Sequence, residues 1–134
     1  MRGARFVDTS FYVALVSPSD ERHTLALHFG EDAGRRSVTT EFVLMEVASY
    51  LTSRKQGRLF LTLAESIAAS RSIRVVPASH SLFAKGVELL RQRPDKGWWL
   101  TDCTSFVVME RMRLSEALTA DHHFQQAGFK AMLA

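Results

Sequence analysis

Residues 99–129 read WLTDCTSFVVMERMRLSEALTADHHFQQAGF, and the fold is most clearly predicted from this stretch. At its start, residues 98–101 are expected to form a strand that leads into Asp102. A helix with a mixed apolar and charged face, FVVMERMR at 106–113, follows. An aspartate therefore stands where an expected strand gives way to a helix.

The second half of the stretch repeats this plan. Residues 116–120 are predicted to form a strand, Asp121 follows its end, and a short helix is expected as far as Gln126. Gly128 can terminate that helix, because glycine adopts the left-handed conformation without steric cost. An edge strand reaching Leu133 is expected after it.

The amino end of the chain has the same order of elements. Residues 5–7 form a short segment that ends at Asp8. Thr9 and Ser10 are good helix openers, and they precede the mostly apolar run FYVALV at 11–16. This pattern predicts a strand followed by a helix, again with an aspartate at the junction.

Further helices and strands alternate in the middle of the chain. They are predicted as a helix that starts at 19–22 and is closed by Gly34, a strand at 36–39, a helix capped by Thr39 or Thr40 that reaches about Lys55, a helix after Gly57, a buried strand at 73–76, a helix at 79–93 and a turn at 94–97. Such alternation predicts an open, mainly parallel sheet with helices on both faces. We therefore expect a three-layer α/β/α fold with a central sheet of four to five strands, formed by one domain over residues 1–134.

Composition narrows the class of protein. The 134 residues are 46% hydrophobic, which is enough for one compact core. The 17 basic and 14 acidic residues give a formal charge of +3, which favours polyanionic partners only mildly.

The single cysteine, Cys103, excludes an intrachain disulfide and fits a cytoplasmic protein. Secretion and membrane insertion are not expected, because residues 11–16 are too short for a signal peptide and no apolar run approaches the required length of about 18 residues.

Three aspartates occupy equivalent places in the predicted fold. Asp8, Asp102 and Asp121 each follow an expected strand. The carboxyl ends of parallel strands meet at one edge of the sheet, where sites form in such folds, so the three can converge. Glu46 lies within the predicted middle helix among apolar neighbours, and its position there needs an explanation.

A cluster of carboxylates is unfavourable without a cation. At roughly 4 Å two like charges repel by about 1 kcal/mol in water and by more in a shielded cleft, so their pKa values rise. A divalent cation reverses this balance, and oxygen ligands suit Mg²⁺ or Mn²⁺ better than zinc. Such an ion can polarise a phosphoryl oxygen and activate a bound water, so the cluster predicts phosphodiester hydrolysis without a covalent intermediate.

Each acidic residue also has a purely structural interpretation. Asp8, Asp102 and Asp121 are suited to capping helices, because a carboxylate accepts backbone N–H groups and favours the positive end of the helix dipole. Glu46 can equally point to solvent. Only the joint pattern of the four favours a site over these separate roles.

Three segments resemble the PIN-domain family, which includes the toxin ribonucleases of VapBC-type toxin–antitoxin modules. They are FVDTSFYVAL at 6–15, TTEFVLMEVASYL at 39–51 and the stretch at 99–129, and they follow the family's order over almost the whole chain. The Thr-Asp-Cys and Ala-Asp-His-His-Phe elements of the last segment are the most specific.

The resemblance implies an endoribonuclease that cleaves single-stranded RNA, with Mg²⁺ or Mn²⁺ held by acidic residues. The family's acidic positions match Asp8, Glu46, Asp102 and Asp121, of which the last is the most variable and is expected to act through water or through its field. Ser10 matches a small polar residue that supports the site in relatives. A toxin of this kind is expected to bind an antitoxin, which would cover the acidic cleft with a basic side chain, and to form a homodimer.

Other residues also suggest a function. His122 and His123 suggest a transition-metal site, but adjacent residues are expected to point in different directions, and no second His or Cys pair has a suitable spacing. Cys103 is expected to be structural, because no base is paired with it. Trp98 and Trp99 can stack on unpaired bases or pack in a core or dimer, and the area that such rings bury favours packing.

Two other functions agree with parts of the pattern. An aspartyl-phosphate enzyme or receiver also places an aspartate after the first strand, but Ser10 stands where a haloacid-dehalogenase-like phosphatase needs a second aspartate. A degenerate PIN-like module would bind RNA or protein without cutting, and the retained acidic set argues against degeneration. The sequence therefore favours a metal-dependent endoribonuclease.

Overall fold

The computed structural model of the protein describes residues 3–31 and 34–134. A five-stranded parallel sheet lies at its centre, in the order β3-β2-β1-β4-β5. Its strands are β1 (Arg5–Val7), β2 (Ser37–Thr40), β3 (Ile73–Val76), β4 (Glu116–Leu118) and β5 (Lys130–Ala131). The predicted class of fold, with a parallel sheet between layers of helices, is confirmed.

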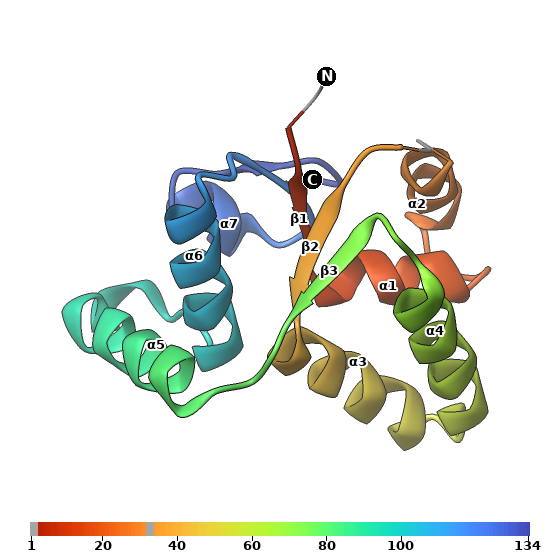
Figure 1. The fold of residues 1–134 in the computed structure, drawn as a ribbon, viewed down its shortest axis with the longest axis horizontal. Coiled ribbons are helices and arrows are strands. Elements are labelled where there is room, and N and C mark those ends of the chain that lie inside the picture. The colour runs from red at the N-terminus through yellow and green to blue at the C-terminus, as the bar shows by residue number, and fades with distance from the viewer. Residues whose placement is uncertain (1–2, 32–33) are drawn as a thin grey trace.

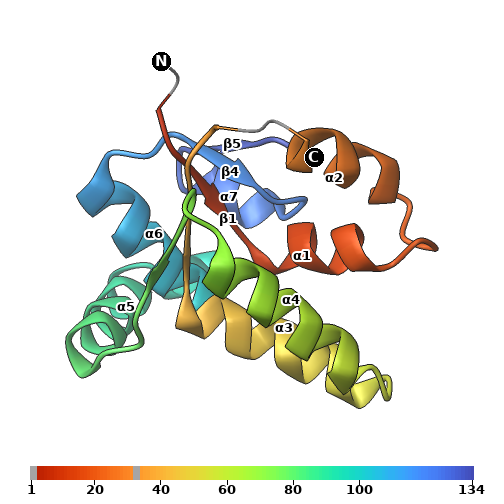
Figure 2. The ribbon, with the colours of Figure 1, turned by 45° about the vertical axis from the view of Figure 1, so that its right-hand side comes forward.

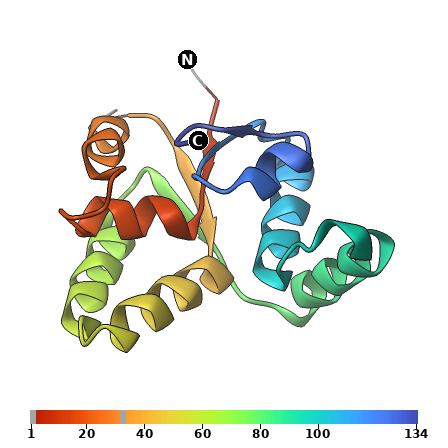
Figure 3. The same ribbon diagram turned by 180° about the vertical axis from the view of Figure 1, so that it is seen from behind.

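Helices cover both faces of this sheet (Figures 1 and 3). One face carries α1 (Thr9–Val16), α2 (His23–Gly30), α3 (Glu41–Ser53) and α4 (Gly57–Ala69). The other carries α5 (His80–Gln92), α6 (Leu100–Met112) and α7 (His122–Gln126), with the short 3₁₀ helix η1 (Pro94–Lys96) between α5 and α6. Figure 2 shows α3 and α4 side by side below the sheet.

The chain changes direction within the sheet between β1 and β4. From β1 it proceeds through β2 to β3, then returns across the other face to β4 and β5 on the far side of β1. Connections diverge at such a switch point and leave a crevice beyond the carboxyl ends of the two strands. Asp8 follows β1 and residues 119–121 follow β4, so both lie at this crevice.

The helix α3 is positioned by its cap and by one buried side. The hydroxyl of Thr40 accepts the backbone N–H of Val43 at 3.1 Å, which satisfies a free donor at the start of the helix. Val43, Val47 and Leu51 recur every four residues and are fully buried, so this side of α3 faces the core. Glu46 precedes Val47 and is therefore carried at the border between core and solvent.

The last helix is held on the sheet by aromatic packing. Phe124 of α7 is fully buried and meets the Phe106 ring of α6 edge to face, with 4.9 Å between the ring centroids. Phe124 also packs on Phe6 of β1 at 6.2 Å. Aromatic pairs of this kind stabilise by about 0.5–1.5 kcal/mol beyond the area they bury. They fix the loop from 119 to 121 against the first strand.

Three predicted elements differ in the structure. Residues 98–101, predicted as a strand, form a loop and the first turn of α6, because the Trp98 ring turns into the core against Phe106. The helix α2 begins at His23, since the Asp20 carboxylate accepts the N–H of Arg22 at 2.8 Å and holds a turn there. The strand β3 is an edge strand and only half-buried.

The predicted end of α2 is only partly open to comparison. The helix ends at Gly30, before Gly34, while Gly34 itself has the left-handed φ of 89°. Residues 32 and 33, in the predicted last turn, lie outside the described residues. Within the two described ranges, none of the helices combines the length and apolar character needed to cross a membrane.

Candidate active site

A cleft of about 400 Å³ opens beyond the carboxyl ends of β1 and β4. The structure brings all of the acidic residues proposed from the sequence, and Ser10, to its walls: Asp8, Ser10, Glu46, Asp102 and Asp121. Ser10, Glu46 and Asp102 come from three helices, and Asp8 and Asp121 from the connections after β1 and β4. The cleft is therefore a meeting point of acidic side chains that are distant in the sequence.

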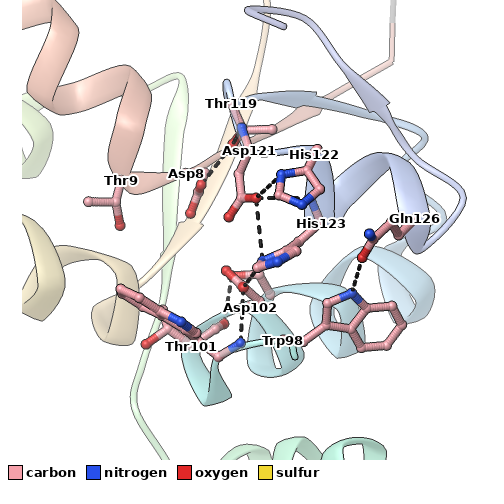
Figure 4. Close-up of polar contacts among 12 residues, drawn as sticks. Asp8, Thr9, Trp98, Thr101, Asp102, Thr119, Asp121, His122, His123 and Gln126 are labelled. Carbon is pink, nitrogen blue, oxygen red and sulfur yellow. Dashed lines mark hydrogen bonds and ion pairs between the residues drawn. The ribbon is translucent and has the colours of Figure 1, made fainter. Parts of the chain in front are cut away.

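Asp8 is the most buried of these carboxylates. It lies directly after β1, and only 5% of the residue is exposed. The Thr119 hydroxyl donates to its Oδ2 at 2.8 Å (Figure 4). The pKa of Asp8 is raised to about 7, mainly by burial and to a smaller extent by the charges of Asp102 and Glu46, although hydrogen bonds from Thr119 and from the backbone of Thr9 lower it. This carboxyl is thus poorly stabilised as an anion by the protein alone.

Thr119 links Asp8 to the loop after β4. Besides donating to Asp8, its hydroxyl accepts the N–H of Asp121 at 3.0 Å. The Ser10 hydroxyl lies 3.2 Å from the Thr119 hydroxyl and accepts the N–H of Ala120 at 3.0 Å. The sequence prediction named Ser10 as a supporting residue but missed Thr119. The only feature of the sequence that points to Thr119 is its position two residues before Asp121.

Replacing Thr119 by valine tests this link, because valine keeps the shape and removes the hydroxyl. We expect affinity for Mn²⁺ to fall by about 10- to 100-fold, since groups that orient metal ligands contribute on this scale. The matched control is Thr39→Val, because Thr39 is equally buried but donates to the Val7 carbonyl at 2.9 Å and lies outside the cleft. Calorimetric titration that gave both variants the same Mn²⁺ affinity would contradict the assignment.

Asp102 is held at the start of α6. It occupies the third position of the helix, and its Oδ2 accepts the N–H of Trp99 at 3.2 Å. The Nδ1 atom of His123 lies 3.0 Å from the same oxygen. Burial raises the pKa of Asp102 to about 6, with a further contribution from the charge of Asp121. Asp102 therefore lies one turn inside the helix rather than at the capping position considered from the sequence, and it combines a helix-start contact with a place in the cleft lining.

Asp121 caps the short helix α7. Its Oδ1 accepts the N–H of His123 at 2.9 Å, and the Nδ1 atoms of His123 and His122 lie 3.4 and 3.7 Å from the same oxygen (Figure 4). One ligand atom from each of these three residues lies within 4.8 Å of the others. The expectation that the adjacent histidines point apart is therefore wrong. The first turn of α7 brings both rings to the capping oxygen, 4.5 Å apart between centroids.

Glu46 faces the cleft rather than only solvent. The hydroxyl of Thr9, the first residue of α1, donates to its Oε1 at 2.5 Å. This contact joins α3 to α1 beside Asp8 and explains an acidic residue at the border of the core. Thr9 is a second supporting residue that sequence reasoning treated only as a helix opener.

The cleft fits a hydrated divalent cation. Asp8 and Asp102 are buried carboxylates with raised pKa values, and a nearby cation would stabilise their charged forms. Among the described residues, the acidic and histidine side chains whose ligand atoms lie within 4.8 Å of one another are those of Asp121, His122 and His123. The other three carboxylates are not part of this close group.

Cys103 follows Asp102 but is not exposed to the cleft. The residue is fully buried, and burial raises the pKa of its thiol to about 11. A thiol with a raised pKa stays protonated near neutral pH and is a poor nucleophile. Its environment agrees with the structural role expected from the sequence.

The chain is similar to known proteins over most of its length. Residues 5–130 match the family model of the PIN domain. The chain is 32% identical over 124 residues to proteins named 23S rRNA-specific endonuclease VapC20 from two strains of Mycobacterium tuberculosis. This alignment covers 92% of this chain and 94% of each relative. A crystal structure of Mycobacterium tuberculosis VapC20, described as a sarcin-ricin loop cleaving toxin, matches with a TM-score of 0.83 and 31% identity over 92% of this chain and 95% of that one.

Proposed function

The chain belongs to the PIN-domain family, and from this premise we propose that it is a metal-dependent endoribonuclease, the toxin of a toxin–antitoxin pair. The observation that carries the proposal is the buried Asp8 carboxylate, which shares one cleft with Glu46, Asp102 and Asp121. The likeness to the VapC20 endonucleases over 92% of the chain supports it. Residues 1–134 form one nuclease domain in this proposal.

The catalytic step is hydrolysis of an RNA phosphodiester. Asp8, Glu46 and Asp102 would hold Mg²⁺ or Mn²⁺ directly or through water, and Asp121 would assist from the loop after β4. The ion supplies Lewis-acid chemistry, by polarising the phosphoryl oxygen and lowering the pKa of the attacking water.

Supporting residues keep these carboxylates in place. Thr119 and Ser10 fix Asp8 relative to the β4 loop, and Thr9 fixes Glu46. His123 lies between Asp102 and Asp121, within hydrogen-bond distance of the first, and limits the movement of both. These contacts hold the ligands ready before an ion binds, which reduces the reorganisation that binding requires.

The substrate class is single-stranded or looped RNA, with ribosomal RNA of the large subunit as the first candidate, because the VapC20 relatives are named for cleavage of 23S rRNA. The partners are an antitoxin protein, which would place a basic side chain in the acidic cleft, and a second copy of the chain in a homodimer. The site of action is the cytoplasm. No residue need form a covalent bond to the substrate.

Purified protein incubated with ribosomes and with isolated ribosomal RNA tests this function. We expect discrete cleavage in Mg²⁺ or Mn²⁺ and none in EDTA, with cleavage restored when the metal is returned. Primer extension would locate the cut. RNA that is bound in a gel-shift assay but stays intact at every metal concentration would contradict the nuclease and favour the non-catalytic PIN-like module.

A further inference from the structure

Two adjacent tryptophans have opposite environments in this structure. Trp98 is 6% exposed, packs edge to face on Phe106 at 5.0 Å, and donates from Nε1 to the Gln126 side chain at 3.1 Å (Figure 4). Trp99 is 68% exposed. The structure therefore settles the packing role for Trp98 only and leaves the large apolar ring of Trp99 in solvent.

Trp99 is also part of the wall of the acidic cleft. Its backbone N–H donates to Oδ2 of Asp102 at 3.2 Å, so the two residues are joined across the first turn of α6. The Thr101 carbonyl between them accepts hydroxyl hydrogen bonds from Thr104 and Ser105, at 2.7 and 3.1 Å, which fasten that turn to the rest of the helix. A group resting on the Trp99 ring is thus held near a carboxylate of the site.

A second aromatic residue of the cleft lining is in contact with a cation. Tyr50 of α3 lines the cleft, and the Arg54 guanidinium lies over its ring, 3.6 Å from the centroid. Tyr50 and Arg54 also line a neighbouring polar hollow of about 460 Å³, which shares Asp20 with the cleft. The lining of the cleft therefore combines carboxylates with the rings of Trp99, just before α6, and of Tyr50 in α3, beside which the Arg54 cation lies. This arrangement fits a strand that carries both bases and phosphates.

We propose that Trp99 is the platform on which one unpaired base of the RNA stacks, next to the phosphodiester that is cut. The inference rests on the proposed endoribonuclease function and adds a positioning residue to it. Stacking on an aromatic side chain requires an unstacked base, which single-stranded and looped RNA offers and a duplex does not. Because every base has a π face, the platform selects for unpaired structure more than for sequence.

A series at Trp99 separates stacking from simple apolar contact. Trp99→Phe keeps an aromatic face, Trp99→Leu keeps only apolar area, and Trp99→Ala removes both. We expect the affinity for a single-stranded substrate to fall by about 5- to 100-fold in the alanine variant, nearly as much in the leucine variant, and little in the phenylalanine variant. The matched control is Phe83→Ala, because Phe83 is an aromatic residue of α5 that is 43% exposed and lies outside the cleft.

An abasic scan of the substrate tests the contact itself. Single abasic nucleotides are placed along an oligoribonucleotide, and cleavage by the wild-type protein and by Trp99→Ala is compared under single-turnover conditions. At one position beside the cut, removal of the base and removal of the ring are expected to be non-additive, since each abolishes the same interaction. Additive losses at every position, or equal activity of Trp99→Leu and wild type, would overturn the proposal.

Tryptophan fluorescence gives a readout that does not depend on cleavage. In EDTA, RNA binding is expected to quench the exposed Trp99 in wild type and in Phe83→Ala, and this change is expected to disappear in Trp99→Phe. A wild-type protein that cleaves RNA while Trp99→Ala cleaves equally well would refute the platform and leave the nuclease standing. Quenching at Trp99 without cleavage of any RNA would support the platform and refute the nuclease.

Discussion

The Asp8→Asn variant is expected to cleave RNA about 1000-fold more slowly than the wild-type protein, or worse, while keeping its fold. Asparagine has nearly the same shape and can still accept the Thr119 hydroxyl, which lies 2.8 Å from Oδ2. It lacks the negative charge that would hold a divalent cation in the proposed function. Lewis-acid stabilisation by a bound metal is worth several kcal/mol, and each 1.4 kcal/mol corresponds to about tenfold in rate.

The same substitution is expected to leave the metal-free protein as stable as before, or more stable. Asp8 is buried with a raised pKa, so ionising it in the folded state is unfavourable and asparagine removes that penalty. The matched control is Asp95→Asn, because Asp95 is exposed on η1 and pairs only with Arg93, at 3.3 Å, among the contacts of the described residues. Cleavage by purified Asp8→Asn at the wild-type rate, with the control also active, would refute a role of Asp8 in holding the ion.

The metal-free protein is expected to become more stable as the pH falls from 8 to 5. The pKa of Asp8 is about 7 and that of Asp102 about 6 in the folded protein, against 3.8 for the ordinary group. Above these pKa values both carboxyls are charged in the folded and in the unfolded state, so the folded protein bears the full free-energy cost of burying the charges. Between about pH 4 and 7 for Asp8, and between about pH 4 and 6 for Asp102, only the unfolded chain is ionised, so stability is regained as the pH falls. Because one pKa unit is about 1.4 kcal/mol, the gain amounts to several kcal/mol.

Thermal unfolding in EDTA across this pH range measures the effect. We expect the Tm to rise by roughly 10 °C on acidification, and Asp8→Asn to flatten most of this dependence. Mn²⁺ is expected to raise the Tm at pH 8 and to lose its effect near pH 5, because protons compete with the ion for the carboxylates. A Tm that falls on acidification in EDTA, with the same slope in Asp8→Asn, would contradict the burial of these charges.

Much of the fold follows from local patterns in the sequence. The segment at 73–76 is a β-branched run before a proline, and the strand there begins and ends at the predicted residues. Thr40 and Ser79 begin their helices as capping residues usually do, each accepting a backbone N–H. Asp8 and Asp121 stand after β1 and β4 as predicted. The ends of these helices and strands could be predicted because they depend on the local chemistry of one residue, such as a capping hydroxyl.

Other features depended on contacts that a single sequence does not reveal. The Trp98 ring packs on Phe106, and this long-range contact turns the expected strand before Asp102 into a loop and helix start. Thr119 is 111 residues from Asp8 in sequence, so no spacing rule pairs the two. The opposite exposures of Trp98 and Trp99 likewise arise from tertiary packing. Supporting contacts of the site were therefore harder to predict than its acidic residues.

The hydrogen bond between Thr119 and Asp8 also has a consequence for synthesis of the protein. A ribosome adds residues in order, and 111 of them separate Asp8 from its buried hydroxyl partner. A nascent chain that has not yet reached β4 has no strand beside the free edge of β1 to carry that hydroxyl or Asp121 into place. On the proposed function, a chain that ends before β4 is therefore expected to lack part of the cutting site, because Thr119 and Asp121 both follow that strand.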